Sequence, residues 1–145
     1  MASVATYLNF KGNCEEAFGF YQEVFQSELA APPMRFGDAP PDENMSPVPE
    51  EAKRQIMHVA MPILGGHQLM GSDVPPAMQH GFVVGTNVQV SLSPDTRAET
   101  DRLFAALGEG GEVKMPLHEQ FWGDYFGLVT DRFGIHWMVG TAAKE

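Results

Sequence analysis

The chain has 145 residues, of which 43% are apolar, so it is long enough to form an ordinary hydrophobic core as a single domain over residues 1–145. Nine basic residues against nineteen acidic ones give a net charge of −10, which disfavours nucleic acid and anionic membrane surfaces as partners. No apolar run approaches the roughly 20 residues of a membrane span, and the start of the chain does not resemble a signal peptide, so we expect a cytoplasmic protein.

The first predicted elements are a strand over residues 3–10 and a helix that follows it. Side chains alternate along the strand, and its mixed face carries Tyr7 and Asn9. Asn13 and Glu16 have the spacing of a capping box at the helix start. The apolar stripe of the helix comprises Ala17, Phe18, Tyr21, Val24 and Phe25.

Cys14 is the only cysteine and falls in the first turn of this helix. The polarity of a helix start can lower the pKa of a thiol. We nevertheless interpret Cys14 as a small structural residue, because nothing near it in sequence forms a nucleophile–base pair.

The rest of the first half is predicted to hold three strands and a long loop. A strand over 28–36 is weakened by Pro32 and Pro33. The acidic, proline-rich segment 37–53 indicates a loop, interpreted as disordered or partner-binding ahead of a lid. Strands over 54–62 and 67–72 form a hairpin around a glycine turn.

The second half repeats this order of elements. A strand over 86–93 precedes a helix that starts at a capping box of Thr96 and Glu99 and ends at Gly108. The apolar stripe of this helix comprises Leu103, Phe104 and Leu107. Three further strands are predicted over 111–117, 121–130 and 135–140.

The two halves, about 3–73 and 86–140, can be superimposed in sequence without gaps at two places. Gly66–Met70 matches Gly134–Met138. In the two helices, the residues Phe20, Tyr21 and Val24 match Leu103, Phe104 and Leu107. An internal repeat explains this better than two unrelated halves do. We therefore predict an α+β fold of two βαβββ modules that form cupped mixed β-sheets.

Several short motifs carry a resemblance to a known family. They are Tyr7–Phe10, Gly12–Ala17, Phe20-Tyr21, His58, Leu69–Asp73, Gly110-Gly111, Phe121–Gly127, Asp131, Phe133-Gly134 and Trp137. Together they resemble the vicinal oxygen chelate superfamily of glyoxalase I, bleomycin-resistance proteins and extradiol dioxygenases. Within it, the chain looks most like the PhnB-like branch, often labelled 3-demethylubiquinone 3-methyltransferase. The resemblance implies a glyoxalase/bleomycin resistance-like fold, two sheets closing around a cavity, and a homodimer.

Many members of that superfamily chelate one divalent metal with His, Glu or Gln from the first and last strand of each half. Carried over, these positions fall on Ala5 or Thr6, Val88 or Gln89, Met70, and Met138. Only Gln89 offers a ligand suited to such an ion, since thioethers suit softer metals. We therefore predict no metal at the usual site and no cofactor. A site built from His58, Asp73 and His136 is the alternative.

The positions of the glycine-rich turns argue against the methyltransferase activity that the family label implies. A methyl-donor site of the usual kind follows a glycine-rich turn after the first strand of a doubly wound sheet. Here that strand ends in Phe10–Asn13, and the cluster Gly108–Gly111 follows a helix instead of preceding one. We expect no methyltransferase activity.

The candidate ligand-binding residues are aromatic, sulfur-containing and polar side chains expected on the inner faces of the sheets. Trp122, Asp124 and Phe126 alternate along strand 121–130, and parity with Met70 and Met138 turns Gln68 and His136 inward. Such a lining suits an organic ligand, although the same side chains could pack a plain core. The set is Tyr7, Asn9, His58, Gln68, Met70, Gln89, Trp122, Asp124, Phe126, His136 and Met138.

The leading functional hypothesis is a small-molecule-binding protein of the glyoxalase/bleomycin-resistance type that works without a metal, as a homodimer. The ligand is an unknown organic molecule, and no catalytic residue is assigned. One alternative is a metal-dependent lyase, isomerase or dioxygenase-like enzyme with shifted ligands among His58, Gln89 and His136. Another is an interaction protein that docks through loop 37–53.

Overall fold

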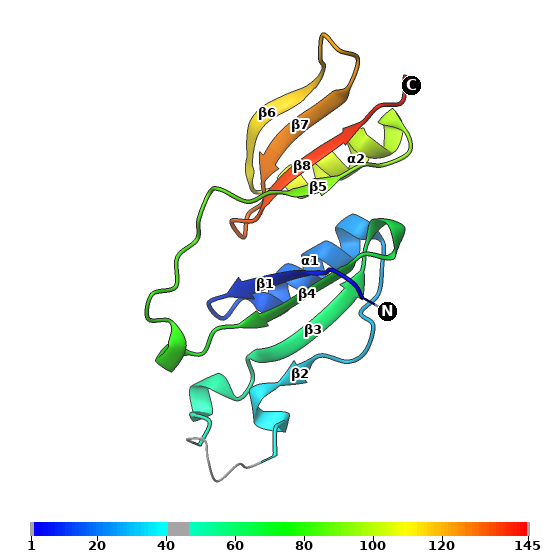
Figure 1. The fold of residues 1–145 in the computed structure, drawn as a ribbon. Coiled ribbons are helices and arrows are strands. Elements are labelled where there is room, and N and C mark those ends of the chain that lie inside the picture. The colour runs from blue at the N-terminus through cyan, green and yellow to red at the C-terminus, as the bar shows by residue number, and fades with distance from the viewer. Residues whose placement is uncertain (1, 41–46, 145) are drawn as a thin grey trace. The chain divides into compact units, whose positions relative to one another are not determined.

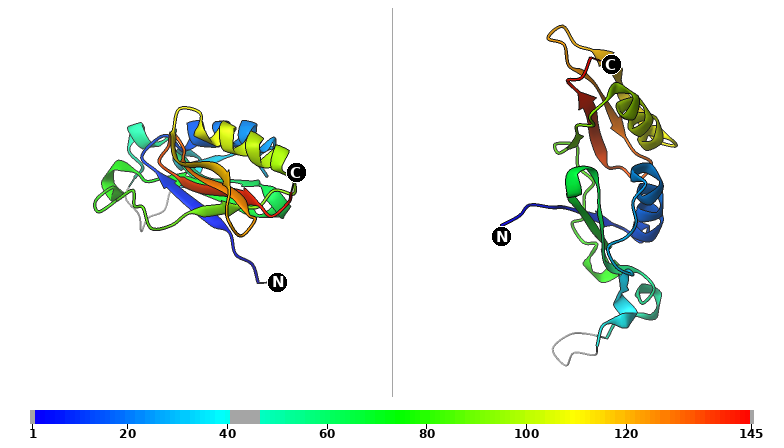
Figure 2. Two further views of the ribbon diagram at one scale, coloured as in Figure 1. Left: turned by 90° about the horizontal axis from the view of Figure 1, so that it is seen from above. Right: turned by 90° about the vertical axis from the view of Figure 1, so that its right-hand side faces the viewer.

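Figure 1 shows the chain as a computed structural model that describes residues 2–40 and 47–144. The chain divides into two compact units, Met1–Phe82 and Val83–Glu145. Each unit holds one α-helix and one four-stranded mixed sheet, and the helix lies on one face of its sheet (Figure 2). The predicted α+β fold of two βαβββ modules is confirmed.

In the first unit the strands lie side by side in the order β1-β4-β3-β2. β1 is parallel to β4, and the other neighbours are antiparallel. The helix α1 connects β1 to β2 across the sheet. The elements are β1 (Thr6–Phe10), α1 (Cys14–Phe25), β2 (Met34–Arg35), β3 (Ile56–Pro62) and β4 (Gln68–Asp73).

The second unit has the same topology, with the strand order β5-β8-β7-β6. β5 is parallel to β8, and the other neighbours are antiparallel. The elements are β5 (Val90–Leu92), α2 (Arg97–Gly108), β6 (Glu112–Glu119), β7 (Tyr125–Thr130) and β8 (His136–Thr141).

Two predicted strands are much shorter than the sequence indicated. The strand over 28–36 shrinks to Met34–Arg35, after the two prolines that cannot donate to a sheet. The strand over 86–93 shrinks to Val90–Leu92, because the residues before it are exposed and lie outside the sheet. Gln89 therefore precedes the strand on which it was expected.

The predicted strand over 121–130 is wrong at its start, because β7 begins only at Tyr125. Residues 120–124 form a tight turn, in which Gly123 N donates to Gln120 O at 2.9 Å and Gln120 N donates to Asp124 O at 2.7 Å. Gly123 has φ +104°, in the left-handed region that favours glycine. Trp122 and Asp124 thus belong to this turn, and they do not alternate with Phe126 along one strand face.

The helix α1 buries the apolar stripe that its period predicts. Phe18 and Tyr21 meet edge to face, with ring centroids 5.6 Å apart. Gly71 allows the Phe18 ring to pack closely against β4, since a Cβ at position 71 would lie 2.6 Å from that ring. The buried residues of the helix are Cys14, Ala17, Phe18, Tyr21 and Val24.

The start of α1 is capped differently from the prediction. Asn13 occupies the N-cap position, but its side chain makes no capping hydrogen bond. Instead the Asp73 carboxylate at the end of β4 accepts hydrogen bonds through Oδ1 from Gly12 N and Cys14 N, both at 2.9 Å. Its Oδ2 accepts from Ile56 N at 2.9 Å. This buried carboxylate therefore joins α1, β3 and β4.

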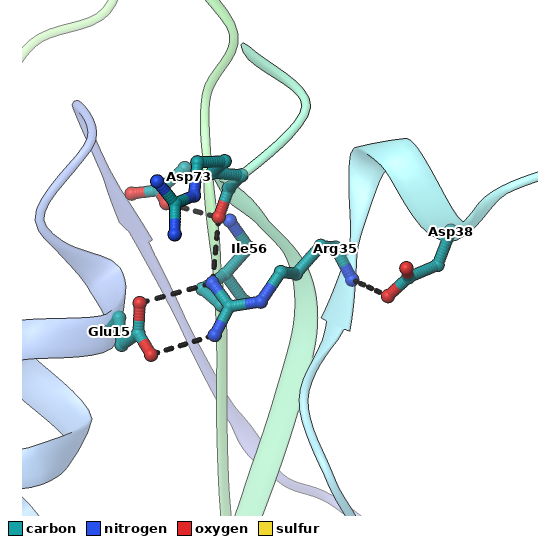
Figure 3. A network of polar contacts seen from close by, with 6 residues as sticks. Glu15, Arg35, Asp38, Ile56 and Asp73 are labelled. Carbon is teal, nitrogen blue, oxygen red and sulfur yellow. Dashed lines mark hydrogen bonds and ion pairs between the residues drawn. The ribbon is translucent and has the colours of Figure 1, made fainter. Parts of the chain in front are cut away.

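An exposed ion pair next to Asp73 ties β2 to α1 (Figure 3). The Arg35 guanidinium donates to both carboxylate oxygens of Glu15, at 3.0 and 2.7 Å, and also to Arg54 O at 2.7 Å. Arg35 holds the pKa of Glu15 below its usual range through these hydrogen bonds.

Cys14 is buried, as a structural residue would be. Burial raises the pKa of the Cys14 thiol, and the nearby Asp73 carboxylate raises it further. Because the thiolate is the reactive form, this cysteine is a poor nucleophile.

In the second unit the Thr96 half of the predicted capping box is confirmed, whereas the Glu99 carboxylate accepts from the Arg102 guanidinium. Thr96 Oγ1 accepts from Glu99 N at 3.1 Å, and Leu103, Phe104 and Leu107 are buried. Asp131 closes the turn between β7 and β8, since its carboxylate accepts from Phe133 N, Ile135 N and, at 2.8 Å, from Trp137 Nε1. The buried indole is thereby satisfied.

The predicted loop 37–53 lies partly outside the described residues. Its described parts contain two short 3₁₀ turns, Phe36–Asp38 and Glu50–Ala52. Further 3₁₀ turns cover Leu64–Gly66 and Pro76–Met78. Within residues 2–40 and 47–144, no helix has both the length and the apolar character that crossing a bilayer would require.

Candidate functional site

In the first unit the candidate residues lie on the face of the sheet that α1 leaves uncovered. Along β1 the side chains of Leu8 and Phe10 are buried under the helix, whereas Tyr7 and Asn9 are exposed. Strand alternation places Gln68 and Met70 on the same face of β4, because Leu69 between them is buried.

Within this face the structure brings Tyr7, His58 and Met70 together. Tyr7 is the register partner of Met70 on the neighbouring strand. The Tyr7 hydroxyl lies 3.3 Å from His58 Nδ1, and the two rings are 5.8 Å apart between centroids. Asn9 accepts a long hydrogen bond of 3.5 Å from Ser72 Oγ. The result is a polar and sulfur-containing surface on which Tyr7 and Asn9 are exposed and His58 and Met70 are half-buried.

The second unit has an open pocket of about 520 Å³ on the corresponding face of its sheet. Its walls come from β5 and the loop to α2, from β7, and from β8 with the segment after it. The lining residues are Ser91, Leu92, Ser93, Pro94, Asp95, Asp124, Phe126, Met138, Gly140, Thr141, Ala142 and Ala143.

The floor of this pocket is set by cross-strand pairs. Ser91 on β5 pairs with Met138 on β8, and Phe126 on β7 pairs with Gly140. A Cβ at position 140 would collide with the Phe126 Cβ, so glycine there leaves room for Phe126 on the neighbouring strand. Phe126 and Met138 thereby form an apolar, sulfur-containing floor, as the sequence predicted for these two residues.

One rim of the pocket is formed by the turn before β7. The Trp122 indole Nε1 donates to Asp124 Oδ2 at 2.9 Å, which fixes the carboxylate of a lining residue. The Trp122 ring also lies 6.2 Å from the Phe126 ring between centroids. Trp122, Asp124 and Phe126 therefore lie close together, as the sequence suggested. The cause is the turn before β7, and not the alternation of side chains along one strand.

The opposite rim is formed by the chain after β8. Ala143 N donates to Thr141 Oγ1 at 3.1 Å, and Ala143 O accepts from Arg97 Nε at 2.9 Å. Arg97 also pairs with Glu119 at 2.8 Å and stacks on the Tyr125 ring. Arg97 therefore fixes the C-terminal wall while its charge is shared with other groups.

Two predicted residues of the second unit do not line this pocket. Gln89 is exposed before β5. His136 sits on β8 with Nε2 2.8 Å from the carbonyl of Gly85 and Nδ1 2.8 Å from Thr130 Oγ1. Because a carbonyl only accepts, Nε2 carries a proton and donates it to Gly85 O. Both nitrogens of His136 are thus engaged in hydrogen bonds within the second unit.

Sequence reasoning missed most of the pocket wall, chiefly Ser91, Ser93, Asp95 and the segment 141–143. A signal was available. The first and last strands of a βαβββ module pair in parallel, so their carboxyl ends meet at one edge of the sheet. Ligands of α/β sheets commonly bind outside the carboxyl ends of parallel strands.

The usual metal positions of the resembling superfamily can now be tested by strand register. Tyr7 lies opposite Met70, and Ser91 lies opposite Met138. Counting back two residues from Tyr7 and Ser91, Ala5 corresponds to Gln89, which resolves the one-residue ambiguity of the sequence. The four positions therefore supply two thioethers, one methyl group and one exposed amide, a donor set that does not fit a hard or borderline divalent ion.

Other side chains do not supply such a set either. Across the two described ranges, no three His, Cys, Asp or Glu side chains gather closely enough to hold a metal ion. Asp73, which the sequence offered as a ligand together with His58 and His136, is already occupied by three backbone N–H groups.

Known proteins resemble this chain over nearly its whole length. A family model described as 3-demethylubiquinone-9 3-methyltransferase matches residues 2–140. Protein YjdN of Escherichia coli (strain K12) is 31% identical over 147 residues, which cover 98% of this chain and 97% of YjdN.

Solved structures agree with these matches. Protein PA1353 from Pseudomonas aeruginosa is 40% identical, with a TM-score of 0.82 over 97% of this chain and 98% of that chain. A PhnB protein from Bacillus cereus is 27% identical, with a TM-score of 0.74 over 97% and 99%. A glyoxalase/bleomycin resistance protein/dioxygenase family enzyme from Burkholderia phytofirmans PsJN, at 16% identity and a TM-score of 0.62 over 95% and 98%, shares the fold. The chain belongs to the PhnB-like 3-demethylubiquinone-9 3-methyltransferase family, whose fold is that of the glyoxalase/bleomycin resistance/dioxygenase proteins.

Proposed function

We propose that this protein binds a small organic molecule in the pocket of its second unit, without a divalent metal. The observation that carries the proposal is the pocket itself. Its volume of about 520 Å³ falls within the range of roughly 300–1,000 Å³ that is typical of small-molecule sites. Phe126 and Met138 offer apolar contact, and hydroxyl and carboxylate groups around them can orient a ligand.

Binding is favoured over catalysis by the chemistry of the lining. Among the twelve lining residues there is no His, Cys, Lys or Tyr to act as nucleophile or neutral-pH base. Asp95 and Asp124 are exposed, so nothing on the wall desolvates a carboxylate in the way that general-acid sites require.

Methyl transfer, which the family description names, is not supported by the sheets of the two units. A methyl-donor site of the usual kind belongs to a doubly wound parallel sheet. Here each unit has a four-stranded mixed sheet in which one pair of strands is parallel and the other neighbours are antiparallel. The proposal therefore assigns the protein a binding role in place of the transferase role.

The test is a ligand-observed NMR screen of small organic molecules against the full chain and a blocked variant. Ala142→Trp adds an indole to an exposed lining residue without touching the core, so it should fill the pocket and abolish binding of the hits. Ala105→Trp is the matched control, because Ala105 is exposed on α2 and does not line the pocket.

The expected result is a set of hits that bind the wild type and Ala105→Trp equally and lose binding, by at least about tenfold, in Ala142→Trp. Hits that bind all three proteins equally would place the binding elsewhere and contradict the proposal. A homodimer remains a prediction from the family resemblance, and sedimentation equilibrium of the full chain checks it.

A further inference from the structure

The ionisable side chains on the pocket wall are all acidic. Among the described residues, the two are Asp95, just before the start of α2, and Asp124, in the turn before β7, and no lysine, arginine or histidine lines the pocket. The hydroxyl groups of Ser91 and Ser93 add further acceptors on the β5 side. A ligand that brings negative charge into this pocket would meet two carboxylates at close range.

Two basic residues lie near the wall without lining it. The Arg97 guanidinium is shared between Ala143 O, Glu119 and the Tyr125 ring. The Lys144 ammonium lies beside the turn before β7, since a Cβ on Gly123 would come within 2.9 Å of Lys144 Nζ. Neither side chain is among the lining residues, so the ionisable groups of the wall itself are the two carboxylates.

The aromatic side chains of this rim offer ring surface. The only polar atom of the Trp122 side chain, Nε1–H, is already donated to Asp124. What Trp122 can offer a ligand is therefore its indole ring, which is 55% exposed and stands next to the Phe126 ring of the pocket floor. An exposed indole held beside a carboxylate is an arrangement that attracts an ammonium group, through both charge and the ring quadrupole.

From this combination we infer that the pocket takes an organic cation, an amine or quaternary ammonium group carried on a flat apolar body. The charged group pairs with the Asp124 and Asp95 carboxylates on the wall, beside the Trp122 ring, and the apolar body covers Phe126 and Met138. The inference rests on the proposed function and specifies the chemical class of its ligand.

The test compares three probes that share one phenyl ring: benzylammonium, neutral benzyl alcohol and benzoate. Each is titrated into the full-length protein while the methyl signal of Met138, which lies on the pocket floor, is followed by NMR. Benzylammonium should bind roughly tenfold more tightly than benzyl alcohol, and benzoate should bind most weakly. Asp124→Asn and Asp95→Asn should each weaken benzylammonium about threefold and leave benzyl alcohol unchanged.

Glu109→Gln is the matched control, because it changes net charge by the same amount at an exposed residue outside the pocket. It should leave the order of the three probes and their affinities unchanged. Equal or tighter binding of benzyl alcohol or benzoate would overturn the cation inference and leave the proposed pocket standing. Absence of any shift at Met138 with all three probes would contradict the pocket proposal, and the cation inference with it.

Discussion

At the scale of single residues, two buried carboxylates organise the two units. Asp73 accepts three backbone hydrogen bonds from α1 and β3, and Asp131 accepts two from its own turn and one from the Trp137 indole. Each carboxylate accepts hydrogen bonds from N–H groups that would otherwise be buried without an acceptor. Stability in each unit should therefore depend strongly on one acidic side chain.

Asp73→Asn is expected to destabilise the protein by about 2–3 kcal/mol, because the new amide group faces a backbone N–H and leaves at least one buried donor unsatisfied. Asp38→Asn is the matched control, since the Asp38 carboxylate is exposed and accepts a hydrogen bond from Arg35 N at 3.0 Å. Its expected cost is below about 1 kcal/mol. Urea unfolding of both variants measures the difference, and equal costs would contradict the role given to Asp73.

These residue roles could be predicted only where the contacts are local. Thr96 and its partner Glu99 are three residues apart, so the capping pattern alone was enough. The same pattern at Asn13 was misleading, because the true cap, Asp73, lies 59 residues after Cys14 in the sequence. No local rule can identify a cap that depends on how a distant strand ends.

At the scale of elements, the turn at residues 120–124 forms one rim of the pocket and fixes its geometry. It depends on Gly123, whose φ of +104° is costly for any residue with a Cβ. The turn also brings Trp122 to Asp124, so its geometry matters both to stability and to the pocket.

Gly123→Ala should lower the free energy of unfolding by about 1–2 kcal/mol, because alanine is strained at this φ. It should also weaken binding of pocket ligands, since the Trp122–Asp124 hydrogen bond depends on the turn. Gly19→Ala is the contrasting control: Gly19 lies within α1, a Cβ there would meet nothing within 4 Å, and alanine favours helix by about 0.5–1 kcal/mol. Thermal and urea unfolding should show opposite signs for the two variants, and matching signs would contradict this reading of the turn.

The order of elements could be predicted because apolar periodicity and glycine turns are local signals. Strand ends could not, and the error at 121–130 shows why. Phe121 and Trp122 are apolar and have high strand propensity, yet Phe121 is 98% exposed in the turn that Gly123 imposes. Pairing with β6 and β8, which decides where β7 starts, is information from outside the segment.

At the scale of the whole molecule, the net charge of −10 acts in the same direction as the acidic pocket wall. A negative protein attracts cations and speeds their encounter at low ionic strength. The pocket itself could not be predicted from the sequence because ordinary serines, alanines and a proline make up five of its twelve lining residues, and these become a site only through strand register.

Binding of a small organic ligand in the second unit should need no divalent metal. A titration of benzylammonium into protein of measured metal content, before and after exhaustive chelation, tests this. We expect the same dissociation constant in both samples, and no recovery or gain when Mn²⁺, Ni²⁺, Zn²⁺ or Fe²⁺ is added. Binding that is lost on chelation and restored by one of these ions would contradict this prediction.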